Sequence, residues 1–551
     1  MIQSAYIPNN RTPFVRTNCT TAGSTKVKSS RVSSSSSTNL RILAARNRSS
    51  KSLLNGGKIS AVVELAADLS ETKERQKNTI RKRAELRVNP PPPEAAQTDR
   101  FSPVELQKFA RRLEEVYRNS PTVSPKEDLG HDWRKYHGSN NWEGLLDPLS
   151  PKLRREIVKY GEFAQATYDA FDFDAHSKYC GSCRFNRQRL LEKLHLQNTG
   201  YRVSKYLYAM SDVHMPKFFG RSNSMDPWSK DSNWMGYVAV STDEETKRLG
   251  RRDIMVAWRG TVTQLEWMEN LRDILHPVGD LGCSECTAIK VERGFLSIYT
   301  SKNDATRYNK HSASKQVMDE IHRLVALYTG RGEEVSISIC GHSLGGALAL
   351  LNAFEIAAKG MNVHANDPTR KVPVTVFSFG APRVGNGAFK DAVEELGVKV
   401  LRVVGKQDVV PKMPGILFNE GMEKYEKVMG RMLESLPWSY KHVGVELGLE
   451  IKKSPFLKSN PDLAGCHNLE VYLHLLDGFE SSTAPFRFEA RRDVALVNKA
   501  SDMLRKDFMV PSNWHQLENK GLVRNCYGRW VQPERDVDDV PSPHGLGNFS
   551  S

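Results

Sequence analysis

One pentapeptide constrains the fold of this chain more than any other stretch. It is Gly341-His-Ser-Leu-Gly345, between a strand-like segment at 335–339 and a helix-like segment at 344–358. Its two glycines remove Cβ atoms that would collide with the neighbouring strand and helix in a sharp turn. We therefore expect a strained strand-to-helix turn from which Ser343 projects, as in a nucleophile elbow. A glycine-rich turn without chemistry has the same local sequence, so this interpretation requires an acid and a base elsewhere.

Strand-like and helix-like stretches alternate on both sides of this turn, which predicts a mostly parallel sheet with crossover helices. The charged stretch 241–252 separates the first two strands and suggests that they form an antiparallel hairpin. Ser150-Pro151 is typical of a helix start, and we expect the helix that follows to be core structure. The predicted strands are 236–240, 253–258, 335–339, 374–379 and 398–404, and the later predicted helices are 314–328, 344–358 and 386–396.

Asp408 is the candidate acid because it stands four residues beyond the strand that ends at Val404, where a carboxylate can orient an imidazole. An ordinary loop aspartate in an Asx-turn would have the same local sequence. The catalytic interpretation gains from chain order, because enzymes with such an elbow carry serine, aspartate and histidine in this sequence.

The base must then be a histidine downstream of Asp408. We favour His467, which lies where a loop meets a helix and can reach over the sheet, whereas His474 is fixed to that helix. The alternatives are His442, His474, His515 and, in a Gly/Pro-rich tail, His544.

The strand 253–258 leads into the turn Arg259-Gly-Thr261. A turn at the carboxyl end of a strand in an α/β sheet commonly displays the backbone donors of a site. A turn that merely carries a hydroxyl fits equally well when it is taken alone.

The positive charge of the chain is concentrated at its amino end. Residues 1–63 contain ten Lys or Arg, thirteen Ser and no Asp or Glu, so removing them lowers the net charge from +15 to about +5. This composition, without a compact apolar segment, predicts a plastid transit peptide and argues against nucleic-acid binding. A disordered basic tail of another purpose is the alternative. The sequence contains no run of 18 apolar residues, so we expect no transmembrane helix.

Two C-x-x-C pairs, Cys180/Cys183 and Cys283/Cys286, invite a zinc or redox interpretation. Ninety-nine residues separate the pairs, far more than in a compact zinc ribbon, and no thioredoxin-like pattern surrounds either. Ordinary cysteines are the simplest interpretation, and a disulfide or a regulatory thiol pair is the alternative.

Six motifs follow one another within roughly residues 125–525. They are Trp258-Arg-Gly-Thr261, Glu292-Arg-Gly-Phe295, Gly341-His-Ser-Leu-Gly-Gly-Ala-Leu348, Phe379-Gly-Ala-Pro-Arg-Val-Gly385, Asp408-Val-Val-Pro411 and Cys466-His-Asn-Leu-Glu470. With these motifs in this order, the chain resembles the class 3, or fungal-type, lipases, and especially their plant plastid-targeted phospholipase A1 branch. One departure is Glu292, where fungal members commonly have a histidine or a lysine.

The resemblance implies an α/β-hydrolase fold in which Ser343 is the nucleophile, Asp408 the acid and His467 the base. It implies that Thr261 and the backbone N–H of Leu344 form the oxyanion hole. It also implies that residues 263–272 form a lid. This chemistry needs no metal and no cofactor.

Four consecutive prolines at 90–93 favour an extended linker before a folded domain. We therefore expect a disordered transit peptide (1–63), a charged, Pro-rich linker (64–94) and a lipase domain (95–480). A C-terminal extension (481–551) is expected to pack on this domain and to end in a disordered tail.

The expected function is that of a phospholipase A1 in the chloroplast, soluble or peripherally associated with membranes. It would cleave sn-1 acyl esters of phosphatidylcholine, galactolipids or triacylglycerol to a fatty acid and a lysolipid. One alternative is a soluble esterase or thioesterase. Another is a catalytically silent lipid-binding scaffold, although such a protein should have lost a residue of the triad and this sequence has lost none.

Overall fold

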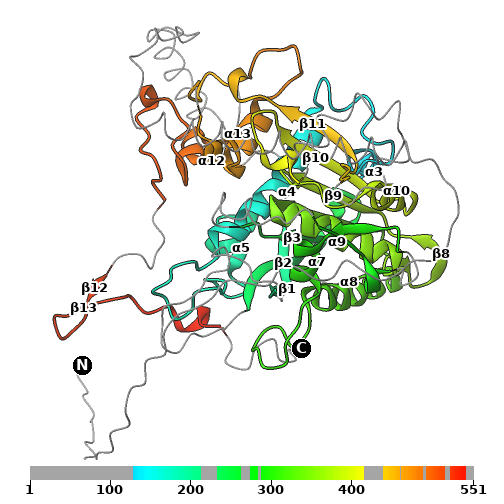
Figure 1. Ribbon diagram of the computed structural model, residues 1–551, viewed down its shortest axis with the longest axis horizontal. Helices are drawn as coiled ribbons and strands as arrows, with labels where there is room; N and C mark the ends of the chain where they lie inside the picture. Colours follow the sequence, from blue (N-terminus) through cyan, green and yellow to red (C-terminus); the bar gives the residue numbers. More distant parts are fainter. Residues whose placement is uncertain are drawn as a thin grey trace, which may run out of the picture. The chain divides into compact units, whose positions relative to one another are not determined.

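The computed structural model describes residues 128–211, 232–261, 274–282, 287–414, 439–459, 461–487, 492–515 and 522–541 (Figure 1). Five features predicted above lie outside these residues: the transit peptide (1–63), the linker (64–94), the lid segment (263–272), the pair Cys283/Cys286 and the alternative base His544. The boundaries that we expect between the parts of the chain stay predictions.

A seven-stranded sheet forms the centre of the described residues, in the order β1-β2-β3-β6-β9-β10-β11. Strands β1, β2 and β3 pair antiparallel, and β3, β6, β9, β10 and β11 pair parallel. The predicted mostly parallel sheet and its antiparallel hairpin are therefore confirmed. The strands are β1 Tyr201–Ala209, β2 Asn233–Ser241, β3 Arg252–Trp258, β6 Val335–His342, β9 Val374–Phe379, β10 Lys399–Gly405 and β11 Val445–Leu449.

Helices cover both faces of this sheet, as Figure 1 shows. Helices α4 and α13 pack on one face, and α7, α8, α9 and α10 pack on the other. The main helices are α4 Pro151–Asp169, α7 Arg293–Thr300, α8 Ala313–Gly330, α9 Leu344–Ala358, α10 Gly387–Glu395 and α13 Leu469–Gly478, with shorter α3 Trp133–Tyr136, α5 Leu190–Lys193, α6 Asp243–Leu249 and α12 Leu463–Cys466.

The strands supply the core of both layers because successive side chains of a strand point to opposite faces. In β3, Met255 and Ala257 join the cluster under α4, whereas Ile254 and Val256 join the cluster under α9. All four side chains are fully buried. Burying an aliphatic side chain such as Ile254 stabilises the fold by about 1.5–3 kcal/mol relative to leaving it exposed. Two hydrophobic cores therefore pack against the opposite faces of one sheet.

A buried carboxylate fixes α4 on the sheet. Asp253 Oδ2 accepts hydrogen bonds from Tyr160 of α4 at 2.8 Å and from Tyr201 of β1 at 2.7 Å, and its Oδ1 accepts from Ser336 at 2.8 Å and Ser338 at 2.6 Å. Because Asp253 lies near the start of β3, these bonds hold the middle of α4 at the amino end of the strands.

Several elements were not predicted from the sequence. Strand β1 has a largely half-buried pattern with Arg202 and Lys205 within it, and so lacks a clear apolar alternation. Strand β11 follows residues 415–438, which lie outside the described part, and extends the parallel part of the sheet beside β10. Helix α6 occupies most of the charged connection 241–252 and is capped by the Thr242 side chain. Short strand pairs join β4 Leu275–Pro277 with β5 Lys290–Glu292, and β7 Val363–His364 with β8 Asp367–Lys371.

Residues from the stretch 492–515 contribute to the core beside α13. Val497, Met503 and Leu504 are buried in the same cluster as the α4 face of the sheet. The main chain of Leu457 also forms a β-bridge with that of Leu504. This stretch therefore belongs to the packed body of the protein.

We predict that stability falls as the pH is lowered from 7 toward 5, partly because of His474. Burial, followed by the charge of Arg492, lowers the pKa of His474 to about 3. The unfolded chain binds a proton near pH 6.5 that the folded chain does not, so stability is lost below that pH, by up to about 1.4 kcal/mol per pH unit. The free energy of unfolding, measured in urea from pH 5 to 7.5, should depend less steeply on pH in the variant His474→Gln. An unchanged slope would contradict the prediction.

Candidate active site

Ser343 occupies a strained turn between β6 and α9. Its φ of 58° and ψ of −129° are rare for a residue with a side chain. A Cβ atom on Gly341 would lie 2.2 Å from the Gly345 carbonyl oxygen, and one on Gly345 would lie 2.2 Å from the Trp258 carbonyl oxygen. The two glycines therefore permit the close approach of β3, β6 and α9 that the turn requires.

Asp408 and His467 meet beside this turn. His467, between α12 and α13, places its Nδ1 2.6 Å from Asp408 Oδ2. The other oxygen, Asp408 Oδ1, accepts a hydrogen bond from the Val410 N–H at 2.9 Å. Both side chains are buried. A carboxylate held in this way fixes the tautomer and the orientation of the imidazole and leaves Nε2 for another group.

Several buried polar atoms at and beside the elbow have no hydrogen-bond partner among the described residues. They include Ser343 Oγ, His467 Nε2 and Thr261 Oγ1, together with His342 Nε2. Buried polar atoms are nearly always paired, so each unpaired one needs an explanation. A hydroxyl, an imidazole nitrogen and a second hydroxyl are the groups that ester hydrolysis by a serine requires, and such groups often form their bonds only with substrate present.

The turn that follows β3 lies directly against the elbow. A Cβ atom on Gly260 would stand 2.5 Å from the His342 carbonyl oxygen and 3.2 Å from the Ser343 Cβ. Thr261 follows immediately and is buried. Leu344, as the first residue of α9, has a backbone N–H with no acceptor inside the helix. Thr261 and Leu344 thus lie on either side of the serine, and their role in an oxyanion hole stays a prediction.

Arg259 holds this turn in place. Its Nε donates to the Trp234 carbonyl at 3.0 Å and its Nη1 to the Gly260 carbonyl at 2.9 Å, while the guanidinium lies 3.7 Å from the centroid of the Phe171 ring. Burial lowers the pKa of Arg259 to about 10. Arg259 therefore acts as a positioning residue for Thr261.

The site includes two tyrosines that were not predicted from the sequence. The Tyr472 hydroxyl donates to Asp408 Oδ2 at 2.6 Å and accepts from the Gly405 N–H at 2.9 Å. The Tyr168 hydroxyl lies 2.8 Å from His342 Nδ1, so the last turn of α4 reaches the site although we expected this helix to be core only. Both tyrosines sit on apolar helix faces, where the sequence signal is that of core packing.

His342, within the pentapeptide, packs against the candidate base. Its ring centroid lies 4.6 Å from that of His467. Burial, and next the charge of a protonated His467, hold the pKa of His342 well below its usual range. This direction favours the neutral form of the His342 imidazole near neutral pH.

Two alternative histidines have other environments. His474 Nε2 lies 2.8 Å from Ser454 Oγ, and its ring packs on Phe456 and Phe486. Burial, and next the charge of Arg402, lower the pKa of His442 to about 2. Neither contacts Asp408 by a hydrogen bond, so the structure brings His467 alone of these three to the carboxylate.

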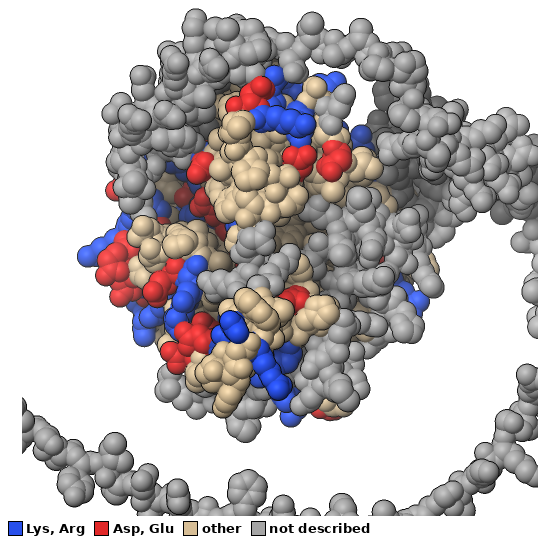
Figure 2. Space-filling view, turned by 90° about the vertical axis from the view of Figure 1, so that its left-hand side faces the viewer, with Lys and Arg blue, Asp and Glu red and all other residues tan. Residues whose placement is uncertain are grey.

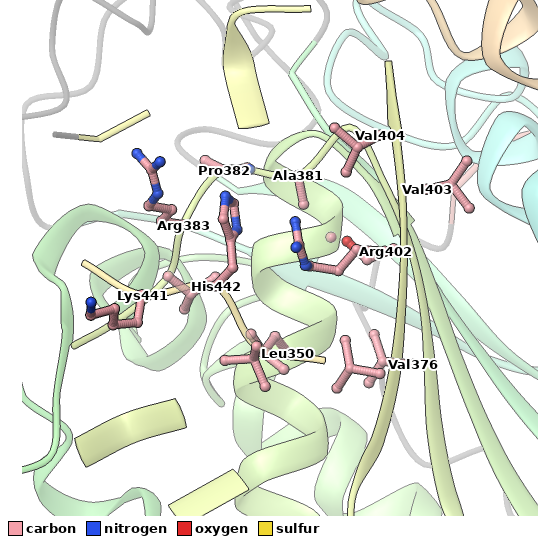
Figure 3. Close-up of a pocket in the computed structure, with 15 residues that line it drawn as sticks. Leu350, Val376, Ala381, Pro382, Arg383, Arg402, Val403, Val404, Lys441 and His442 are labelled. Carbon is pink, nitrogen blue, oxygen red and sulfur yellow. The ribbon is translucent and has the colours of Figure 1, made fainter. Parts of the chain in front are cut away.

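A pocket lies beside the elbow helix, with about 400 Å³ of space that includes open solvent (Figure 3). Leu350 of α9 and Val376 of β9 form its apolar floor, and Arg402 and His442 point into it. Arg402 Nη2 donates to Glu446 at 2.9 Å. Because Ser343 and His467 do not line this pocket, it is separate from the candidate active site.

Cys180, Cys183 and the departing Glu292 form no hydrogen bond with Asp408 or His467. Burial raises the pKa of the Cys180 thiol to about 12 and that of Cys183 to about 11. Glu292 caps α7 by accepting from the Phe295 N–H at 2.8 Å, a structural role. The part of the chain that is described holds no group of three or more His, Cys, Asp or Glu able to bind a metal ion.

The chain is similar to known proteins in sequence and in structure. The family described as Lipase (class 3) matches residues 255–418. Phospholipase A1-Igamma1, chloroplastic, from Arabidopsis thaliana is 50% identical over 444 residues, which cover 79% of this chain and 84% of that protein. Phospholipase A1-II 1 from Oryza sativa subsp. indica is 39% identical and covers 75% of this chain and 98% of its own length. A crystal structure of a lipase from Rhizopus microsporus var. chinensis aligns with a TM-score of 0.34 at 19% identity, over 61% of this chain and 86% of that one.

We predict that Tyr472→Phe lowers kcat about tenfold on any ester substrate and leaves KM unchanged, because Asp408 loses a charge-assisted hydrogen bond. Tyr237→Phe is the matched control, since this equally buried tyrosine donates to the Phe163 carbonyl and not to Asp408. Both variants should lose a similar amount of thermal stability. Equal losses of activity in the two would show that Tyr472 supports the fold alone.

A second prediction concerns the Thr261 hydroxyl. Thr261→Val keeps the shape of the side chain and should lower kcat by about 10²–10³-fold, as the loss of an oxyanion donor does. Stability should not fall, because the removed hydroxyl is buried and unpaired among the described residues. Thr261→Ser, which restores a hydroxyl, should recover most of the activity. If Thr261→Val is fully active, the prediction is wrong and backbone N–H groups alone stabilise the oxyanion.

Proposed function

The chain belongs to the class 3 lipase family and to its plant phospholipase A1 branch, and on that premise we propose that it hydrolyses the sn-1 acyl ester of membrane phospholipids with Ser343 as nucleophile. The enzyme is a carboxylic ester hydrolase of the chloroplast. One geometric observation carries the assignment of the residues. It is the buried Asp408–His467 pair, at 2.6 Å, next to a serine held in a strained turn.

The reaction begins with the transfer of the Ser343 proton to His467 Nε2 as Oγ attacks the ester carbonyl carbon. A serine hydroxyl is a weak nucleophile near neutral pH, so the imidazole must accept its proton as the new C–O bond forms. Asp408 accepts the Nδ1–H of His467 and stabilises the imidazolium. Tyr472 and the Val410 N–H keep that carboxylate in place.

The carbonyl oxygen becomes an oxyanion as its π bond opens. The Leu344 N–H at the start of α9 and the Thr261 hydroxyl provide donors to this charge. Each such donor contributes on the order of 3–4 kcal/mol to transition-state stabilisation in serine hydrolases. The dipole of α9 adds to this effect, because its positive end lies at Leu344.

Collapse of this intermediate expels the lysolipid alkoxide, which takes the proton back from His467 Nε2. The acyl group then remains on Ser343 Oγ. Water, deprotonated by His467, attacks this acyl-enzyme and releases the fatty acid with Ser343 restored. The scheme balances with water as the sole co-substrate.

Glycerolipids are the substrate class, and we extend the proposal to galactolipids and triacylglycerol as further substrates. The substrate lies in a bilayer, and the enzyme would act at that surface. No helix of the described residues is long and apolar enough to cross a membrane.

On the face shown in Figure 2, Lys and Arg are interspersed with Asp and Glu over the described surface and form no continuous basic area.

We predict that Ser343→Ala and His467→Gln each lower kcat by about 10⁶-fold, since the members of a triad act as a unit. His474→Gln is the matched control, because it alters another buried histidine on the same stretch and should retain activity. The measurement is lipid profiling by mass spectrometry after incubation with phosphatidylcholine, monogalactosyl lipid and triacylglycerol in parallel. Retention of a tenth of the activity in Ser343→Ala would refute the assignment of the nucleophile.

The same experiment separates the alternatives. A soluble esterase or thioesterase would hydrolyse monomeric short-chain esters and leave the three lipids intact. A silent scaffold would bind vesicles and release no fatty acid from any substrate. Release of the sn-1 fatty acid, with a 2-acyl lysolipid as the other product, is the expected result.

A further inference from the structure

A short hairpin near the carboxyl end of the chain exposes an unusual concentration of apolar side chains. It consists of β12 Val523–Arg524 and β13 Trp530–Val531, labelled in Figure 1. Eleven large apolar side chains are exposed in the described part of the chain, and five of them fall within residues 522–531. Single exposed apolar residues need no explanation, but a cluster in ten residues does. The five are Leu522, Val523, Tyr527, Trp530 and Val531.

The tip of the hairpin is held by its own hydrogen bonds. The Asn525 N–H donates to the Arg529 carbonyl at 2.8 Å, and Asn525 Oδ1 accepts from the N–H groups of Tyr527 at 3.1 Å and Arg529 at 3.0 Å. Gly528 closes the turn with a φ of 76°. This arrangement leaves Tyr527 85% exposed and Trp530 66% exposed. The two aromatic rings are therefore presented to the surroundings by a locally ordered turn.

The base of the hairpin is fixed to the body of the protein. Directly after β13, Gln532 donates to Asp174 at 3.0 Å. Arg535, which is buried, pairs with Asp172 at 2.6 Å and donates to the Ser182 hydroxyl at 3.1 Å. The hairpin is thus tied to residues 172–182, which follow α4.

This attachment lies at the same end of the sheet as the candidate active site. Helix α4 runs from the amino end of the strands, where Tyr160 bonds Asp253, to their carboxyl end, where Tyr168 contacts His342. The ring of Phe171, just beyond α4, supports Arg259 beside the oxyanion turn. Asp172 comes next in the chain. The hairpin base and the reacting serine therefore share one end of the molecule.

The charge of the hairpin suits an anionic lipid surface. Residues 522–531 carry two arginines, Arg524 and Arg529, and no Asp or Glu. Tryptophan and tyrosine are the side chains enriched at membrane–water interfaces, because each combines an apolar body with a polar group. A basic residue near an anionic bilayer strengthens binding about fivefold through its attraction to the lipid headgroups.

We propose that the β12–β13 hairpin is a membrane-contact element that inserts Tyr527 and Trp530 into the interface of an anionic bilayer and so presents the Ser343 end of the sheet to lipid. This inference rests on the proposed function, since a lipid-ester substrate gives the contact its purpose. It assigns the hairpin to association with the surface and gives it no part in the chemical step.

Cys526, at the tip, provides a direct probe because it is exposed, whereas Cys180, Cys183, Cys340 and Cys466 are buried. An environment-sensitive fluorophore is attached to Cys526 in a full-length chain in which Cys19, Cys283 and Cys286 are serine. The expected result is a blue shift with vesicles of phosphatidylcholine and phosphatidylglycerol, and quenching by lipids brominated on the acyl chains. An emission spectrum that these vesicles leave unchanged would overturn the proposal.

Variants then test whether the hairpin drives binding. Trp530→Ser with Tyr527→Ser should weaken vesicle sedimentation by about tenfold or more, and Arg524→Gln and Arg529→Gln by about fivefold each on anionic vesicles. Met509→Ser is the matched control, since this residue is 88% exposed and lies outside the hairpin. Hydrolysis of a monomeric short-chain ester should be the same in all of them.

Two further outcomes would refute the membrane contact. The first is unchanged vesicle binding of the variant that carries Trp530→Ser and Tyr527→Ser. The second is conversion of a dimer to a monomer by the same variant in analytical ultracentrifugation, which would make the hairpin an interface between two copies of the chain. Failure of the proposed function would give a different result. If the chain binds vesicles through the hairpin but releases no fatty acid, the membrane contact is supported and the proposed hydrolase activity is refuted.

Discussion

The close approach of three backbones at Ser343 is the constraint on which the rest of the structure depends. Strained backbone of this kind costs on the order of 1–3 kcal/mol and persists only where its surroundings enforce it. Here β3 pairs with β6 up to Gly341, and the Gly345 backbone of α9 lies against the Trp258 carbonyl. Two apolar cores hold these elements from opposite faces of the sheet. The stability of the whole domain therefore maintains the geometry of one turn.

Helix α4 connects the two ends of this arrangement. The buried hydrogen bond from Tyr160 to Asp253 anchors it at the amino end of the strands, and the Tyr168 hydroxyl meets His342 at the carboxyl end. Burial of so many polar groups is stabilising only when they are paired, and around Asp253 they are. By contrast, the unpaired atoms Ser343 Oγ, His467 Nε2 and Thr261 Oγ1 gather at the other end. The protein thus separates a carboxylate whose hydrogen bonds are satisfied from a set of groups available for chemistry.

Residues outside the proposed triad give it its shape. Tyr472 and the Val410 N–H orient Asp408, and Arg259 fixes the turn that carries Thr261. These contacts restrict the acid and the oxyanion turn before any substrate arrives, which is how preorganised groups lower a reaction barrier. The β12–β13 hairpin is likewise held in place before any lipid arrives, because its base is attached to the residues that follow α4.

The sequence by itself determined the alternation of strands and helices, the elbow and the order of Ser343, Asp408 and His467. It could do so because glycine spacing, apolar periodicity and chain order are local properties that backbone sterics translate directly into structure. It did not single out Tyr472 or Tyr168, and it gave no reason to choose His467 over His474 beyond their positions near a helix start. These placements depend on contacts between residues 59, 64 and 174 positions apart, in His467–Asp408, Tyr472–Asp408 and Tyr168–His342. Only the tertiary structure decided them, because packing brings such side chains together and no local pattern records it.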